Sequence, residues 1–181
     1  VRHRAHADAP RYGDGVMSLQ WRGQFLEVHR EGTWEYAART RSIGAAVILA
    51  LTDARDIVLV EQFRVPFGRP CIELPAGLVG DEIAGEDAAA SAARELHEET
   101  GFVAALWEDL GEFATSPGMS SESFRLFRAT GLTRTGAGGG TPQEAITVHV
   151  VALAALPDWL AAQRARGCVI DCRLVVGLGL V

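Results

Sequence analysis

Apolar and polar residues alternate through the N-terminal part of the chain, from residue 16 to residue 40. The alternation falls into three short runs, 16–21, 24–31 and 33–40, which are separated by glycine-containing turns. Successive side chains of a strand point to opposite faces, so a period of two predicts three short strands. Residues 1–15 are polar and mixed and lack this pattern, and we expect a flexible tail there.

Further along, apolar residues form continuous runs. Two runs of strand length, 43–51 and 57–63, flank the polar residues 53–56 and predict a hairpin of two buried strands. The other predicted elements are strands at 71–74, 106–114, 123–129 and 145–152, a mobile glycine-rich loop at 133–141, and helices at 156–166 and 171–180. Together they predict an α/β fold, an α/β/α sandwich with a mixed β-sheet, plus N-terminal antiparallel strands.

The stretch 80–102 predicts a loop that runs into a helix with an unusual acidic face. Glycine at position 101 is typical of the residue that follows a helix C-terminus. Glu95, Glu98 and Glu99 have the i, i+3, i+4 spacing that places side chains next to one another on a helix. Three adjacent carboxylates repel, whereas a divalent cation such as Mg²⁺ prefers oxygen ligands and bridges carboxylates to phosphates. The residues predicted to face the core are Ala88, Ala89, Ala92, Ala93 and Leu96.

Two interpretations of the acidic face follow from the residues alone. It is either a metal site or a solvated helix surface, which is the ordinary role of glutamate clusters. Arg94 precedes Glu98 by four residues and can steady it through an ion pair.

Composition narrows the class of protein. A chain of 181 residues with 48% hydrophobic residues suits one globular domain with a sizeable core. A net charge of −6 argues against nucleic acid as a partner, since nucleic-acid binding requires a broad basic surface. No apolar run reaches membrane-spanning length, so we expect no membrane partner. Cys71, Cys168 and Cys172 form no paired pattern, which indicates a reduced, cytoplasmic protein.

The spacing of the acidic helix resembles the Nudix box. Its fixed positions here are Gly80, Glu86, Arg94-Glu95-Leu96, Glu98-Glu99 and Gly101-Phe102. From Trp21 onward the chain is similar to the ADP-ribose pyrophosphatase branch of that superfamily, through the segments WEYAART, VLVEQFRVPFGRPCIELPAGLV and SPGMS. The resemblance implies a Nudix hydrolase domain over residues 43–181. It also implies that strands in residues 16–42 exchange with a partner in a homodimer.

The resemblance further implies a metal site and a catalytic base. The implied ligands of Mg²⁺, which Mn²⁺ can replace, are Ala76 through its carbonyl, Glu95, Glu98 and Glu99. Two residues remain open as the base: Glu98 on the helix, and Glu144, which precedes the last predicted strand. Arg94 joins the catalytic residues through its pair with Glu98.

The implied substrate-binding residues are Trp21, Trp34, Glu35, Arg39, Arg64, Glu73, Gly77, Pro117 and Met119. Trp34 and Glu35 match an adenine-contacting pair. Trp21 is either a second aromatic face for the base or a strand core residue.

Arginines and one glutamate are implied near the phosphates and the ribose. Arg39 and Arg64 match phosphate-facing arginines, whose planar fork suits anionic oxygens. A surface arginine remains the alternative for Arg39, and a strand-end carboxylate remains the alternative for Glu73.

The activity expected from the resemblance is hydrolysis of the pyrophosphate bond of ADP-ribose to AMP and ribose 5-phosphate. Broader hydrolysis of nucleoside diphosphate sugars, such as ADP-glucose or GDP-mannose, is the alternative, since the box does not contact the distal sugar. A non-catalytic ADP-ribose sensor is a third class, and such modules usually lose box glutamates that are present here. Activity is expected to rise toward mildly alkaline pH, because metal binds the deprotonated carboxylates.

Overall fold

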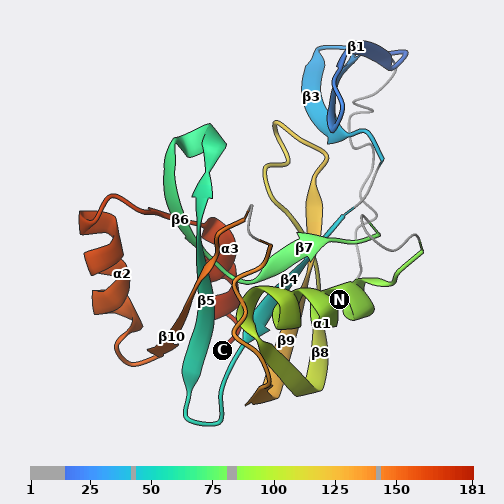
Figure 1. Cartoon of the computed structure of the whole chain (residues 1–181). Helices are drawn as coiled ribbons and strands as arrows, with labels where there is room; N and C mark the ends of the chain where they lie inside the picture. Colours follow the sequence, from blue (N-terminus) through green and yellow to red (C-terminus); the bar gives the residue numbers. More distant parts are fainter. Residues whose placement is uncertain (1–14, 42–43, 81–84, 142–143) are drawn as a thin grey trace, which may run out of the picture. The chain divides into compact units, whose positions relative to one another are not determined.

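The computed structural model describes residues 15–41, 44–80, 85–141 and 144–181 (Figure 1). The chain divides into two compact units: Val1–Ser42 with Ala114–Glu122, and Ile43–Phe113 with Ser123–Val181. The predicted tail of residues 1–15 lies outside the described residues, except for Gly15.

The first unit is built on a three-stranded antiparallel sheet. Its strands are β1 (Ser18–Arg22), β2 (Leu26–Glu31) and β3 (Trp34–Arg39), in the order β1-β2-β3. All three strands were predicted from the alternating pattern and are confirmed. Ala37 of β3 donates its N–H to the carbonyl of Met119 at 2.9 Å, which ties the turn of residues 114–122 to the sheet.

The second unit contains two mixed four-stranded sheets. The strands are β4 (Ala45–Ala50), β5 (Asp56–Arg64), β6 (Arg69–Glu73), β7 (Ala76–Leu78), β8 (Phe102–Ala114), β9 (Ser123–Arg134), β10 (Thr147–Ala152) and β11 (Val169–Ile170). One sheet has the order β7-β4-β9-β8, the other β10-β5-β6-β11. The helices are α1 (Ala88–Thr100), α2 (Leu156–Ala165) and α3 (Cys172–Leu178), and a 3₁₀ turn, η1, spans Val65–Phe67. No helix in the described part of the chain is both long and apolar enough to cross a bilayer.

The predicted hairpin of the two apolar runs is wrong. A tight turn does join β4 to β5, but the only bridge between them joins Leu51 to Ile57 among the described residues. The strands then separate into different sheets, where β4 pairs with β7 and β9, and β5 pairs with β6 and β10. A run that is apolar at every position indicates burial on both faces but carries no information about which strand lies beside it.

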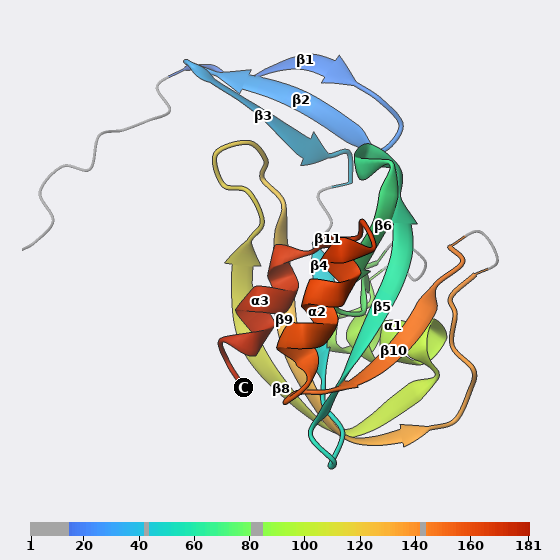
Figure 2. The ribbon, with the colours of Figure 1, turned by 90° about the vertical axis from the view of Figure 1, so that its left-hand side faces the viewer.

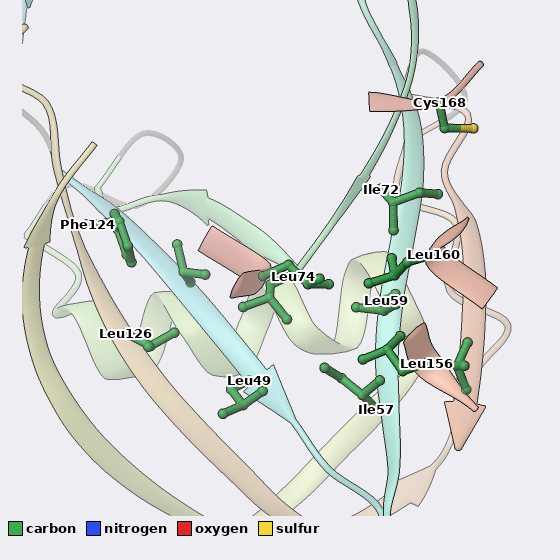
Figure 3. Packing of buried hydrophobic residues seen from close by; sticks show 13 residues of the cluster. Leu49, Ile57, Leu59, Ile72, Leu74, Phe124, Leu126, Leu156, Leu160 and Cys168 are labelled. Carbon is green, nitrogen blue, oxygen red and sulfur yellow. The ribbon is translucent and has the colours of Figure 1, made fainter. Parts of the chain in front are cut away.

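The two faces of the sheets bury separate clusters. Val47 and Leu49 of β4 point to one side, where they join Leu156 and Leu160 of α2 (Figure 3). The alternate residues of β4 point to the other side, where Ile48 joins residues of α1. Helices therefore cover both faces, with α1 on one and α2 and α3 on the other (Figure 2). The predicted α/β/α arrangement is confirmed, with its strands divided between two sheets.

The chain passes from one sheet to the other between Glu73 and Ala76. Leu74 is buried in the core, and the Pro75 carbonyl accepts from the Ile48 N–H at 2.9 Å. This crossing delivers β7 to the edge of β4, where it also packs against α1. The crossing thus brings Ala76 and Gly77 next to the acidic helix.

Candidate active site

The acidic stretch forms α1, as predicted. The Asp87 side chain caps the helix by accepting from the Ala90 N–H at 2.8 Å, and Gly101 ends it with a φ of 74°. The buried stripe is narrower than expected, because Ala92 and Leu96 are buried whereas Ala89 and Ala93 are exposed. Since the buried stripe continues to Glu99 at i+7 from Ala92, an acidic residue lies on the face that packs against the sheets.

The glutamates of α1 differ sharply in exposure. Glu99 is only 5% exposed, and its carboxylate accepts from the Ala76 N–H at 3.0 Å. Glu95 is half-buried over Gly77, and a Cβ atom at position 77 would lie 2.0 Å from the Glu95 carboxyl carbon. Glu98 is the most exposed of the three. The glycine in β7 therefore permits the close approach of a carboxylate to the strand.

Arg94 gathers the neighbouring carboxylates. It pairs with Glu98 at 2.9 Å, as predicted, and also with Glu95 at 3.0 Å and Glu86 at 3.3 Å. Burial alone lowers the pKa of Arg94, but the three carboxylates raise it above its ordinary value. One guanidinium thus holds the loop before α1 and two helix glutamates together.

The charge of Glu99 is poorly compensated. Burial raises its pKa to about 8; the Ala76 hydrogen bond opposes the rise, and the charges of Glu95, Glu144 and Glu73 add to it. Within the described residues no three acidic, histidine or cysteine side chains form a ready metal cluster. The donor set nevertheless fits a hard divalent cation. A buried carboxyl with a raised pKa and acidic neighbours is stabilised in its charged form when such an ion binds it.

Glu144 is held by its own loop. Its carboxylate accepts from both the N–H of Thr141 at 2.7 Å and the Thr141 hydroxyl at 2.9 Å. Its charge raises the pKa of Glu99, which places the two acids in one electrostatic environment. Both candidate bases, Glu98 and Glu144, therefore belong to the same acidic region of the second unit.

A second buried acid lies at the end of β6. Glu73 is 1% exposed, and Arg64 of β5 donates to its two oxygens at 2.6 and 2.7 Å. Arg173 of α3 donates to the same carboxylate at 3.1 Å and to Asp171 at 2.7 Å through Nε. The hydrogen bond from Arg64 to Glu73 raises the pKa of that arginine. Sequence analysis missed Arg173, whose only local signal is its position beside a helix-capping aspartate.

The other predicted substrate residues lie in the first unit. Trp21 is 57% exposed and Trp34 is 46% exposed in the single chain. Arg39 is paired with Glu122 at 2.5 Å, both partly buried. The remaining residues of this group are Glu35 on β3 and Pro117 and Met119 in the turn of residues 114–122.

Known proteins resemble this chain in sequence and in fold. A family model described as the NUDIX domain matches residues 41–171. An ADP-ribose pyrophosphatase of Mycobacterium tuberculosis is 46% identical over 93 residues, which are 51% of this chain and 44% of that protein. An uncharacterized Nudix hydrolase of Schizosaccharomyces pombe is 34% identical over 161 residues, 81% of this chain and 77% of that protein.

A solved structure titled as an ADP compounds hydrolase superposes with a TM-score of 0.65 at 21% identity, over 81% of this chain and 80% of that one. The likeness at this identity concerns the fold. The chain spans about half the length of several curated relatives that it matches.

Proposed function

The chain belongs to the Nudix family, and from that premise we propose that it hydrolyses the pyrophosphate bond of ADP-ribose. The products are AMP and ribose 5-phosphate, with one water consumed. The observation that carries the proposal is Glu99, a buried carboxyl whose pKa is raised to about 8 beside two further helix glutamates. Such a group is costly for folding alone and is suited to a cation that also binds a diphosphate.

The implied metal ligands are the Ala76 carbonyl, Glu95, Glu98 and Glu99. Mg²⁺, or Mn²⁺ in its place, supplies neutralisation of the diphosphate charge and a lower pKa for water when it is bound. Arg94 orients two of these carboxylates, at 3.0 Å from Glu95 and 2.9 Å from Glu98. Removing Arg94 should therefore weaken catalysis through the ligands that it orients.

A carboxylate of the chain takes the proton of the attacking water. The water oxygen then bonds to one phosphorus as the bond between that phosphorus and the bridging oxygen breaks. The bridging oxygen leaves with the other phosphate. Glu98 suits this role because it is the most exposed of the helix glutamates, and Glu144 suits it because its carboxylate is oriented by Thr141. We propose both as candidates for the base.

The remaining residues that the family resemblance implies are proposed to recognise the substrate. Trp34, Glu35 and Trp21 would contact the adenine, and the exposure of both indole rings supports stacking. Arg39 and Arg64 would face the phosphates, while Glu73 fixes the orientation of Arg64. Gly77, Pro117 and Met119 complete the proposed contacts. Because stacking tolerates different bases, hydrolysis of other nucleoside diphosphate sugars is the alternative function.

Turnover on a substrate panel tests the proposal. The panel contains ADP-ribose, ADP-glucose, GDP-mannose, UDP-glucose and 8-oxo-dGTP, each with and without Mg²⁺. We expect Mg²⁺-dependent hydrolysis with the largest kcat/KM for ADP-ribose. Equal rates on all sugars would favour the broader hydrolase. Tight ADP-ribose binding without turnover of any compound would favour a sensor.

Two substitutions identify the base. Glu98→Gln and Glu144→Gln keep the size of each side chain, and the one that removes the base should lower kcat about 10²- to 10⁴-fold while ADP-ribose binding persists. Glu108→Gln is the control, since Glu108 pairs with Arg128 on an exposed surface of the same unit. Loss of activity in neither variant would overturn the assignment of the base.

We further propose a cytoplasmic homodimer in which the three-stranded sheet contacts a second copy. The sheet and its turns expose large apolar side chains, among them Leu19, Trp21 and Phe25, as interaction surfaces do. The three free cysteines support a reducing compartment. Sedimentation equilibrium should give a dimer that Phe25→Glu weakens, and a monomeric wild-type protein would contradict this.

A further inference from the structure

The glycine-rich segment that follows β9 is packed on the C-terminal end of α1. The sequence predicts a mobile loop here, but the backbone of the segment is hydrogen bonded to the helix. The Gly139 N–H donates to the carbonyl of Glu99 at 2.7 Å, and the Gly140 N–H donates to that of Glu98 at 3.1 Å. The last carbonyls of a helix have no partners within the helix, so the segment satisfies two of them from outside.

The same segment also binds the residue that ends the helix. The N–H groups of Thr135 and Gly136 both donate to the Gly101 carbonyl, at 2.8 and 3.1 Å. Four main-chain hydrogen bonds thus join residues 135–140 to α1 and its capping glycine. The segment lies beside α1 in Figure 2, where it is drawn in orange.

The contact leaves no room for side chains. A Cβ atom on Gly138 would lie 2.4 Å from the carbonyl carbon of Thr100, and one on Gly101 would lie 2.2 Å from the carbonyl oxygen of Gly136. Both neighbours are main-chain atoms, which cannot rotate away. Gly101 therefore meets two requirements, because it adopts the left-handed conformation that ends α1 and admits the passing segment.

The next residues hold a candidate base. Thr141 donates its N–H and its hydroxyl to one carboxylate oxygen of Glu144, at 2.7 and 2.9 Å. A Cβ atom on Gly140 would lie 2.6 Å from the same oxygen. An uninterrupted series of short contacts therefore runs from the carbonyls of Glu98 and Glu99, through the glycines, to the Glu144 carboxylate.

We propose that residues 135–141 form a positioning element that sets the Glu144 carboxylate relative to the acidic face of α1, with Thr141 as its positioning residue. The proposal rests on the proposed function, in which Glu144 acts on the substrate. Its physical basis is that main-chain contacts leave little freedom, and a displacement of about 1 Å in a reacting group costs up to about 100-fold in rate.

Gly138→Ala is the first test, and Gly167→Ala is its matched control. Both glycines have positive φ, +70° and +91°, so both substitutions strain the backbone, but a Cβ atom at position 167 meets nothing within 4 Å. We expect Gly138→Ala to lower kcat for ADP-ribose about 10- to 100-fold with KM changed less than about threefold. Equal effects of the two substitutions would overturn the proposal.

Thr141 provides a second variant that leaves the glycines intact. Thr141→Val keeps the shape and the N–H but loses the hydroxyl, and Thr141→Ser restores the hydroxyl. We expect kcat to fall about three- to tenfold in the valine variant and to return in the serine variant. A valine variant with unchanged kcat would show that the hydroxyl does not position Glu144. In a Glu144→Gln background neither Gly138→Ala nor Thr141→Val should lower kcat further, and additive losses would contradict action through Glu144.

Hydrogen exchange tests the element without any turnover. The amides of Gly139 and Gly140 should exchange slowly in the wild-type protein and in Gly167→Ala, and faster in Gly138→Ala. If these amides exchange slowly but the protein hydrolyses none of the panel, the packing of residues 135–140 on α1 is supported and the proposed function is wrong. Fast exchange of both amides in the wild-type protein would overturn the positioning element itself.

Discussion

Two buried glutamates in the second unit have opposite surroundings. Glu73, 1% exposed, receives three hydrogen bonds from the guanidinium groups of Arg64 and Arg173, at 2.6 to 3.1 Å. Glu99, 5% exposed, receives one from the Ala76 N–H at 3.0 Å. A buried carboxylate is stable only where its charge is compensated. Arginines of the chain compensate the charge of Glu73, whereas the charge of Glu99 would have to be compensated by a bound cation.

The pKa values at the two glutamates differ in the same way. Beside Glu73, burial together with the charges of Glu73 and Asp171 raises the pKa of the Cys71 thiol to about 12, which makes that cysteine unreactive. At Glu99 the neighbouring acids raise the pKa of the carboxyl itself, to about 8. The chain therefore supplies the positive charge that the first cluster needs, whereas a cation would complete the second.

Removing the charge of Glu73 should produce the largest effect. Glu73→Gln leaves Arg64 and Arg173 beside a neutral amide, and breaking a buried pair costs about 3 kcal/mol. For a chain of this size the expected fall in Tm is about 6–12 °C. Thermal unfolding followed by circular dichroism measures it. The control is Glu108→Gln, which removes an exposed pair with Arg128, and an equal Tm in both variants would contradict a structural role for Glu73.

Mg²⁺ should stabilise the wild-type protein, and more so at alkaline pH. At about 100 times its dissociation constant a ligand adds about 2.7 kcal/mol to the free energy of unfolding. Because the metal binds the deprotonated carboxyl, protons compete with it below the pKa of Glu99, which is about 8. Titration of Tm with MgCl₂ at pH 8 and pH 5 should show a clear rise only at pH 8. The same rise at both values would refute the link to Glu99.

Glu99→Gln should change stability in the opposite direction to Glu73→Gln. The pKa of Glu99 is raised from 4.5 to about 8 in the fold, so the metal-free folded protein retains a proton that the unfolded chain loses between these values. Stability is therefore lost as pH rises through that window. The neutral amide removes this loss, and we expect the metal-free variant to be more stable than wild type at pH 8 and within about 1 kcal/mol of it at pH 5. Urea unfolding in EDTA measures the stability at both pH values. A variant less stable than wild type at pH 8 would be evidence that the buried charge of Glu99 does not destabilise the metal-free fold.

Local patterns predicted the parts of this molecule that depend on neighbours in sequence. The period-two runs predicted the three N-terminal strands. The spacing of Arg94 and Glu98 predicted an ion pair, which the structure shows at 2.9 Å. The separation of β4 from β5 was not predictable, since apolar runs do not specify their partners. Arg173 pairs with Glu73 across 100 residues of sequence, and the packing of residues 135–140 on α1 depends on main-chain carbonyls that no side-chain pattern reveals. The roles assigned to the site residues remain predictions.

The smallest effect should come from Asp171, which contacts the Glu73 cluster through Arg173. Its side chain caps α3 by accepting from the Arg173 N–H at 2.8 Å, and its other oxygen accepts from Arg173 Nε at 2.7 Å. Asp171→Ala should cost about 1 kcal/mol, which is the usual value of a helix cap. Asp171→Ser keeps the cap without the charge and should recover most of that loss in urea unfolding. Since Arg64 alone still binds both oxygens of Glu73, the alanine variant should remain more stable than Glu73→Gln. An equal loss of stability in Asp171→Ala and Glu73→Gln would mean that Asp171 and Glu73 act as one network. The charge of Glu73 would then be compensated by Arg173 as much as by Arg64.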